Sequence, residues 1–377
     1  MIDLVIKNGV VIDTVLKINT KMDIAINAGK IFKVGDCENI ESKMTIDASG
    51  CYVTPGLIDY HCHIYYGGCT FGLLPEIMHF PNGVTTVVDA GTTGEANFPA
   101  FYNSILTSSV ADTRAFLLLS SGGQVAHGYV EDMCPENFKL DRIAETCEKY
   151  KDKIIGLKIR QSIPIVKEYC LRPLKRAVEI ANEVGLRLSV HSSNAPGEVK
   201  DTMDILRPGD IYCHAFHDQG KTILDENGKV LPAVLEAREK GILFETARGN
   251  TQFSVDIAAK AFSQGFYPDI ISSDMAIASA TNQPSMSFSF IISELLNLGM
   301  TFEDIIKRCT EIPGKLMGIG EDGFISEGKK ADIAIFKIVD KEYAYKDFYG
   351  NDMHCNKFIT PEMTLKDGVI VHRNYNF

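Results

Sequence analysis

The chain has 377 residues, 45% of them hydrophobic, and its 38 basic and 49 acidic side chains give a net charge of −11. This length fits one large domain, with or without a small companion. No basic run is long enough to follow a nucleic-acid backbone, and no apolar run is long enough to cross a bilayer. We therefore expect neither nucleic acid nor a membrane as a partner. The ten cysteines form no CxxC pair. Free thiols in a reducing cytoplasm are therefore expected.

Four segments near the chain ends alternate apolar and polar residues, which is typical of β-strands: residues 4–13, 22–35, 323–338 and 363–373. We expect the first to be a hairpin that turns at Asn8-Gly9 and the second to turn at Ala28-Gly29, because both dipeptides favour tight turns. These patterns predict a small β-sandwich domain formed by residues 1–53 and 321–377. A larger domain, residues 54–320, lies between its two halves.

The central domain alternates short apolar runs with amphipathic segments. The apolar runs are residues 56–61, 83–90, 115–120, 153–159, 186–190, 210–215, 241–246 and 269–274. The clearest amphipathic segments are 135–151, 172–185, 233–241 and 255–265, each with apolar residues three and four apart. Eight buried strands separated by helices predict an α/β fold of the (β/α)8 TIM-barrel type. A doubly wound open sheet is the alternative, but no glycine-rich phosphate loop follows the first strand.

Polar side chains stand near the ends of the predicted barrel strands, where function collects in such barrels. They are His61, His63, Lys158, His191, His214 and Asp274. Any one histidine could be an ordinary hydrogen-bonded core residue. Four imidazoles, a lysine and an aspartate at one rim favour a metal site instead.

Lys158 binds no metal as an ammonium, and burial disfavours its charged form. A neutral amine can take up carbon dioxide to form a carbamate that bridges two metals, whereas the alternative is a lysine paired with Asp274 or another acid. Arg160 lies on the same strand face as Lys158 and could bind a substrate carboxylate, and Arg248 is a second candidate. For both arginines the alternative is a salt bridge to a barrel acid such as Glu245.

Two residues of the loop after the third strand, His127 and Tyr129, are weaker candidates for the pocket. We expect His79, His217, His354 and His372 to be structural. Asp89 and Thr85, on the second strand, are expected to support the ligands or pack rather than to bind metal.

The order of these residues, with HxH on strand 1, Lys on strand 4, His on strands 5 and 6 and Asp on strand 8, resembles the binuclear amidohydrolase superfamily. TPGLIDYHCH, NGVVID, GKIFKVG and GKKADIAIF look like further segments of that family. The resemblance implies that His61, His63 and Asp274 hold one metal and that His191 and His214 hold the other. The Lys158 carbamate would lie between two divalent metals, most simply zinc. A bridging hydroxide would then attack the substrate, and Asp274 would carry the proton to the leaving group.

Within the superfamily the chain most resembles a deacetylase-like group often labelled dihydroorotase or D-aminoacylase. This resemblance implies hydrolysis of an acyl amide or ester of a small carboxylate-bearing molecule, such as an N-acyl amino acid or an O-acyl hydroxy acid. The chain departs from the group at Ala247-Arg248-Gly249, where Gly-His-Gly is expected, and this leaves the substrate open.

The alternatives are a cyclic-amide hydrolase of the dihydroorotase or dihydropyrimidinase type and an isoaspartyl dipeptidase. A deaminase is disfavoured because no Glu closely follows His214. A non-catalytic scaffold is disfavoured because no ligand position is lost. The expected partner is a small-molecule substrate, and a homo-oligomer stays open.

Overall fold

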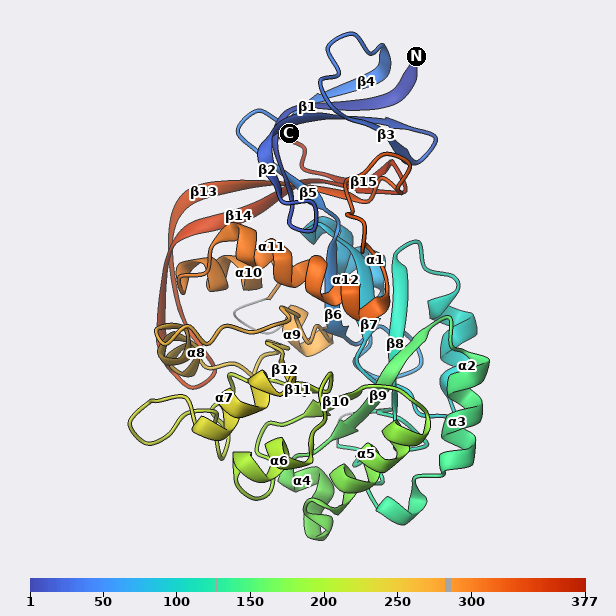
Figure 1. Ribbon diagram of the computed structural model, residues 1–377, viewed down its shortest axis with the longest axis vertical. Helices are drawn as coiled ribbons and strands as arrows, with labels where there is room; N and C mark the ends of the chain where they lie inside the picture. The colour runs from blue at the N-terminus through green and yellow to red at the C-terminus, as the bar shows by residue number, and fades with distance from the viewer. Residues whose placement is uncertain (127, 282–285) are drawn as a thin grey trace.

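The computed structural model describes residues 1–126, 128–281 and 286–377. Strands from both chain ends form one sheet at the top of Figure 1, and a second, helix-covered sheet lies below it. The strands of the terminal sheet are β1 (Ile2–Asp13), β2 (Ile18–Asn27), β3 (Lys30–Gly35), β4 (Ser42–Asp47), β5 (Tyr52–Pro55), β13 (Ile333–Lys346), β14 (Asp352–Lys366) and β15 (Val369–Arg373). Their order is β15-β14-β13-β5-β1-β2-β3, and β4 also pairs with β1.

The terminal sheet joins the two ends of the chain through β5, which pairs with β1 on one side and with β13 on the other. Its apolar face has a core of its own, with Ile6 and Val53 from one end and Ile335 and Leu365 from the other. The described strands form one eight-stranded sheet, so the predicted β-sandwich is corrected to a single mixed sheet. The predicted boundary between residues 53 and 54 falls inside β5 (Tyr52–Pro55). The domain boundaries stay a prediction.

The predicted hairpin at residues 4–13 is wrong. These residues belong to the continuous strand β1, and Asn8, with a φ of 67°, makes a bulge in it rather than a turn. Aspartates on neighbouring strands hold the bulge, because Asp23 accepts from the Asn8 backbone N–H at 3.0 Å and Asp47 accepts from its side chain at 2.9 Å. An Asn-Gly dipeptide can form either feature, and these tertiary contacts decide between them.

The turn at Ala28-Gly29 is confirmed, since it joins the antiparallel strands β2 and β3 with left-handed φ angles of 49° and 78°. The C-terminal strands differ from the prediction in length. β13 has 14 residues and β14 has 15, and together they form a long hairpin. Figure 1 shows this hairpin leaving the terminal sheet and running beside α10 towards α8.

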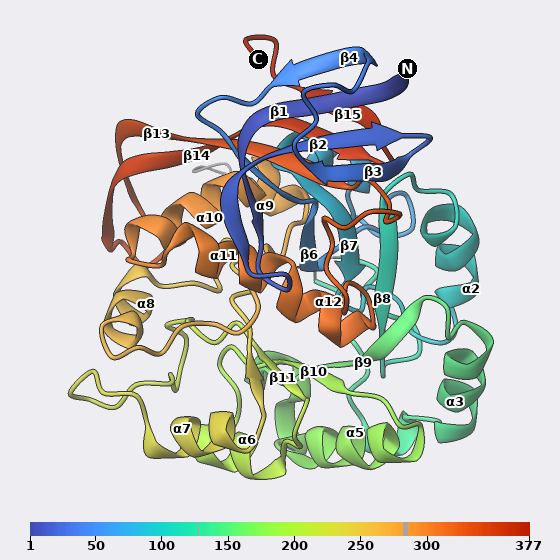
Figure 2. The same ribbon diagram turned by 45° about the horizontal axis from the view of Figure 1, so that its top comes forward.

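Seven parallel strands form the second sheet, which curls as a barrel does (Figure 2). They are β6 (Leu57–Cys62), β7 (Val84–Asp89), β8 (Asp112–Leu118), β9 (Ile154–Arg160), β10 (Leu188–His191), β11 (Ile211–Cys213) and β12 (Leu243–Phe244), and each pairs with the next in chain order. Seven of the eight predicted strands are therefore present at their predicted places.

The eighth predicted strand, residues 269–274, is not a regular strand. Single parallel bridges join Ile270 to Glu245 and Met275 to Cys62, one towards each edge of the sheet. Asp274 donates its backbone N–H to the His61 carbonyl at 2.7 Å. The sheet is thus a seven-stranded open barrel, and an irregular segment lies across its gap. Irregular backbone is what allows Asp274 its left-handed φ of 52°.

Helices follow most of the parallel strands. They are α1 (Pro75–His79), α2 (Phe98–Phe101), α3 (Leu140–Lys149), α4 (Ile163–Val166), α5 (Arg172–Glu183), α6 (Val199–Ile205), α7 (Pro232–Glu239), α8 (Val255–Phe262), α9 (Ile277–Thr281), α10 (Phe288–Asn297), α11 (Phe302–Cys309) and α12 (Glu311–Met317). Short 3-10 turns cover Phe80–Asn82, Pro135–Asn137 and Lys167–Tyr169, and a π-turn covers Tyr102–Leu106. All four predicted amphipathic segments contain a helix, although the one at 135–151 is regular only from Leu140.

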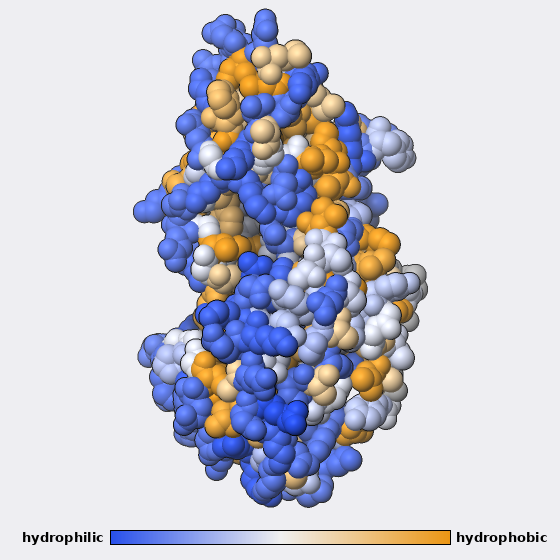
Figure 3. Space-filling model, turned by 90° about the vertical axis from the view of Figure 1, so that its right-hand side faces the viewer, coloured by the Kyte–Doolittle hydropathy of each residue, from blue (hydrophilic) through white to orange (hydrophobic). Residues whose placement is uncertain are grey.

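The surface on the side of α2 and α3 is mainly hydrophilic, and its apolar atoms lie in separate patches (Figure 3). Among the described helices, none is both long enough and apolar enough to span a bilayer.

Candidate functional site

A cavity of about 620 Å³ opens where the parallel strands end. Every predicted site residue lines it: His61, His63, Lys158, Arg160, His191, His214, Arg248 and Asp274. The loop residue Tyr129 lines it too, whereas His127 lies outside the described residues. Strand ends from across the curled sheet thus deliver these side chains to one place, as the barrel pattern predicts.

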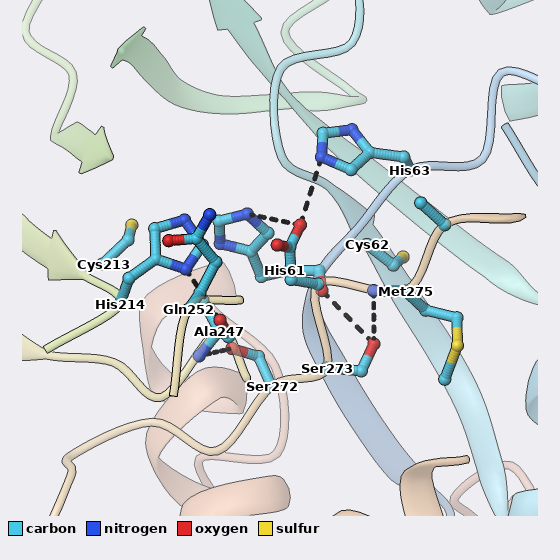
Figure 4. Close-up of polar contacts among 12 residues, drawn as sticks. His61, Cys62, His63, Cys213, His214, Ala247, Gln252, Ser272, Ser273 and Met275 are labelled. Atoms are coloured by element: carbon cyan, nitrogen blue, oxygen red, sulfur yellow. Dashed lines mark hydrogen bonds and ion pairs between the residues drawn. The ribbon is translucent and has the colours of Figure 1, made fainter. Parts of the chain in front are cut away.

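His61, His63 and Asp274 form the tightest cluster of possible metal ligands. The carboxylate atom Oδ1 of Asp274 lies 3.3 Å from His63 Nε2 and 3.6 Å from His61 Nε2. His61 and His63 share a face because they stand two residues apart at the end of β6. Figure 4 shows both rings directed to the same region, which the ring of His214 also faces.

The far side of the His61 ring is held by a carboxylate. Its Nδ1 lies 3.1 Å from Oε2 of Glu245, and Ser272 donates to the other oxygen of Glu245 at 2.8 Å. Burial acts to raise the pKa of Glu245, but the neighbouring imidazole of His61, which is hydrogen-bonded to it, brings the pKa below its ordinary value. The ionised acid therefore accepts the Nδ1–H of His61, which leaves Nε2 for the cavity.

The ring of His63 is held by a hydroxyl. Its Nδ1 lies 2.8 Å from Oγ1 of Thr92, and that hydroxyl donates its only proton to Asp89 at 2.8 Å. Thr92 can therefore only accept from His63, which puts the ring proton on Nδ1. Asp89 also accepts three backbone N–H groups, from Ile64, Gly91 and Thr92, which fix it in place.

His214 is oriented by the backbone, because its Nδ1 donates to the carbonyl of Ala247 at 2.7 Å (Figure 4). In three separate histidines, then, Nδ1 donates away from the cavity and Nε2 is left with a lone pair. Two of these nitrogens face Asp274 Oδ1, so three acceptor atoms meet with no donor between them. Only a cation, or an added proton on a ring, relieves such an arrangement, and the donor set fits a divalent metal.

His191 and His214 lie side by side, with ring centroids 4.4 Å apart. Burial lowers the pKa of His191 well below its ordinary value, and the nearby His214 and Arg160 add to this effect. Burial also lowers the pKa of His214, and the charge of Asp274 only partly opposes it. Both rings are thus neutral at pH 7, which is the form that binds metals.

Asp274 is ionised. Burial acts to raise its pKa, but the three imidazoles beside it, those of His63, His61 and His214, bring the pKa below its usual range. The backbone of Gly249 packs directly against the Asp274 carboxylate, because a Cβ on Gly249 would lie 2.6 Å from it. His214 and Asp274 both have left-handed φ angles, of 59° and 52°. Such strain in residues other than glycine is typical of functional sites.

Lys158 is 2% exposed, and its ammonium lies 3.2 Å from Ser189 Oγ and 3.5 Å from Cys213 Sγ. Within the described part of the chain it forms no ion pair, so the alternative of pairing with Asp274 or another acid is not observed. Gly91 lies against its stem, because a Cβ there would be 2.6 Å from the Lys158 Cβ. Glu245 is near enough for its pKa to be lowered by His61 and, to a lesser degree, by Lys158, but among the described residues no direct ion pair holds the ammonium. A buried lysine without a direct ion pair is an unusual structural residue and a natural candidate for modification.

Arg160 and Arg248 each have an acid partner, but not the Glu245 that the sequence suggested. Arg160 Nη1 donates to Glu131, whose side chain is buried, while the arginine itself is 26% exposed on the cavity side. Neither Glu131 nor its contact was predicted, because Glu131 belongs to an irregular loop without periodicity.

Arg248 is 3% exposed and meets Glu294 of α10 through two parallel bonds of 3.0 and 2.8 Å. Its Nη1 donates to the Gly249 carbonyl at 2.9 Å, and Tyr345 of β13 donates to the same glutamate. Burial acts to lower the pKa of Arg248, but Glu294 raises it above its ordinary value. Most donors of this guanidinium are used inside the protein.

Sequence reasoning missed two acids that hold the site, Glu245 as a support for His61 and Asp59. Asp59 accepts the Ser273 backbone N–H at 3.0 Å and pairs with His79 at 3.1 Å, so it fixes the segment that carries Asp274. Strand alternation was the available signal, because Asp59 stands two residues before His61.

Comparison with known proteins agrees with this geometry. The amidohydrolase family pattern matches residues 52–371. A deacetylase from Brucella anthropi is 30% identical over 339 residues, which cover 89% of this chain and 84% of the relative. A crystal structure described as a dihydroorotase superposes with a TM-score of 0.90 at 29% identity, covering 98% of each chain. One described as an adenine deaminase has a TM-score of 0.90 at 28% identity, covering 99% of this chain and 100% of the other. The chain therefore belongs to the amidohydrolase family and is a hydrolase of that superfamily.

Proposed function

We propose that this enzyme hydrolyses the acyl amide or acyl ester bond of a small molecule that carries a carboxylate, such as an N-acyl amino acid or an O-acyl hydroxy acid. The observation that carries the proposal is the partly exposed Arg160 in the same cavity as the ligand cluster. Glu131 accepts from one nitrogen of the Arg160 guanidinium. The remaining N–H groups can donate to both oxygens of a substrate carboxylate. The deacetylase of Brucella anthropi supports acyl hydrolysis.

The proposed cofactor is a pair of divalent cations, zinc by the chemistry of imidazole and carboxylate ligands. His61, His63 and Asp274 would hold one, and His191 and His214 the other. A carbamate on Lys158, formed when its neutral amine adds carbon dioxide and loses a proton, would lie between them. When bound, such cations activate a water molecule and polarise the scissile carbonyl.

We assign separate roles in the reaction to polar residues around the cavity. Asp274 accepts a proton from the attacking water and gives it to the leaving nitrogen or oxygen as the bond to the acyl carbon breaks. Arg160 holds the substrate carboxylate, and Glu131 fixes the direction of the guanidinium. The buried cavity base excludes bulk water, which strengthens both electrostatic contacts.

A cyclic-amide hydrolase is the second candidate, and the similarity to the structure described as a dihydroorotase favours it. Both candidates can hydrolyse an amide, so a choice between them needs a comparison of substrates. A panel of N-acetyl amino acids, O-acetyl hydroxy acids, their neutral amides, dihydroorotate and adenine does so. We expect the acylated acids to be turned over fastest.

Arg160→Met is the sharpest test of the carboxylate contact. It is expected to lower kcat/KM for acylated acids, with a loss of transition-state stabilisation of about 2–4 kcal/mol, because an unpaired carboxylate would enter a dry pocket. The metal content should not change. Arg142→Met, on the exposed face of α3, is the matched control. Equal turnover of acids and their amides by the unmutated enzyme would contradict the proposal and favour the cyclic amide.

A further inference from the structure

The mouth of the cavity carries exposed apolar side chains. Phe348, at the tip of the β13–β14 hairpin, is 64% exposed and lines the cavity. Tyr129 and Val130, from the loop that follows β8, also line it and are 53% and 45% exposed. Single exposed apolar residues are ordinary, but three around one opening indicate a surface that meets a ligand.

The hairpin tip is fixed in place by the loop that follows β12 and by the first residue of α8. Asp347 accepts the Val255 backbone N–H at 2.8 Å, and the Tyr349 hydroxyl donates to the Thr251 carbonyl at 2.6 Å. The Phe348 and Tyr349 rings meet edge to face, with centroids 5.4 Å apart. The backbone on both sides of Phe348 is thus anchored, while its ring stays in the opening.

The hairpin is also anchored along its length. Tyr345 of β13 shares Glu294 with Arg248; Arg248 and Glu294 are buried, and Tyr345 is half-buried. Figures 1 and 2 show the hairpin alongside α10, the helix that carries Glu294. Arg248, in the place where the family resemblance led us to expect a histidine, therefore joins the cavity wall to the hairpin that presents Phe348.

Polarity changes with depth in this cavity. The base holds imidazoles, Asp274 and Lys158, whereas the mouth holds the exposed apolar side chains of Phe348, Tyr129 and Val130. Lys346 lines the mouth too, and its ammonium is paired with Asp352 at 2.7 Å. A substrate whose acyl group reaches the base must place its remaining part against the mouth. Burying an apolar group there is favourable, and burying a second charge is not.

We propose that Phe348 is a specificity-determining residue that receives a bulky apolar group of the substrate, so that the preferred acylated acids carry an aromatic or large branched substituent. This inference rests on the proposed acyl hydrolysis. It also assigns the C-terminal hairpin a direct part in substrate choice.

The kinetic test compares N-acetylphenylalanine with N-acetylglycine. Both enantiomers of N-acetylphenylalanine are measured. Phe348→Ala is expected to lower the ratio of their kcat/KM values about tenfold, since the phenyl group loses one wall of its subsite. Phe32→Ala changes a similarly exposed phenylalanine on β3, 55% exposed and outside the cavity lining, and should leave the ratio as it was. An unchanged ratio in Phe348→Ala overturns the proposal.

A binding test separates this inference from the proposed function. The chain contains no Trp, so Phe348→Trp introduces a single fluorescent reporter at the mouth. Titration with 3-phenylpropionate, which has no acyl bond to cleave, should give a saturable emission shift, and acetate should not. Phe32→Trp is the control. If the emission shifts but the unmutated enzyme hydrolyses no acyl substrate, the apolar subsite is supported and the proposed reaction is rejected. If 3-phenylpropionate causes no shift, the subsite is rejected.

Discussion

The base and the mouth of the cavity are built in different ways. At the base, side chains from the ends of parallel strands converge, and a partner outside the cavity holds each of three histidines in place, as Thr92 does for His63. At the mouth, Tyr129 comes from an irregular loop and Phe348 from a hairpin that starts in the other sheet. In barrels of this kind, the residues at the strand ends carry the chemistry that relatives can share. Loops and hairpins at the mouth can vary without disturbing those residues, so they can set which substrate is accepted.

The largest effect is expected at the base. Removing bound metal with a chelator should abolish hydrolysis, by about a thousandfold or more, because an uncharged carbonyl would meet no electrophile. Elemental analysis of enzyme prepared without chelator should give between about one and two metal equivalents per chain, as the two-metal ligand set requires. Undiminished activity in metal-free enzyme would reject the metal site.

The same prediction extends to Lys158→Ala, which should lose both metal and activity. Lys240→Ala, at the exposed end of α7, is the matched control and should keep both. Excess of a small carboxylic acid should restore part of the lost activity if a carbamate normally bridges the metals. An unmodified lysine in a metal-loaded structure would contradict that role.

The second effect tests the link between base and mouth. Arg248→Met leaves Glu294 buried without its bidentate partner, so the free energy of unfolding should fall by about 3–5 kcal/mol. Urea denaturation measures this change. Arg172→Met breaks an ion pair in which the arginine is 60% exposed, and it should cost only about 0–1 kcal/mol.

A stable Arg248→Met enzyme with a raised KM for acylated acids would reverse this interpretation. Arg248 would then be a substrate ligand, as its place after the seventh strand first suggested, and the hairpin would be held by its other contacts.

The smallest effect concerns a supporting residue. Thr92→Val removes the acceptor for His63 Nδ1–H, so the ring is no longer held in the metal-binding tautomer. Loss of such a support typically weakens metal affinity about 10–100-fold. Competition with a chelating dye measures it, with Thr45→Val on the exposed face of β4 as the control. Unaltered affinity would show that His63 needs no partner.

Local patterns in the sequence were sufficient for much of the molecule. Strand alternation put His61 and His63 on one face, and apolar runs located seven of the parallel strands. These features depend on neighbours two to four residues apart, which a sequence displays directly. The hairpin turn at Ala28-Gly29 was equally readable, because its left-handed backbone is a local preference.

Tertiary structure alone decided the features that depend on residues far apart in the chain. Asn8-Gly9 became a bulge because Asp23 and Asp47 lie beside it, and Arg248 became a buried anchor because α10 brings Glu294 to it. The part of the β13–β14 hairpin that reaches the cavity carries no pattern that points to the site, yet long-range contacts place Phe348 there. Chemical identity and short spacing therefore determined which groups could react, while packing between distant segments determined which of them line the cavity.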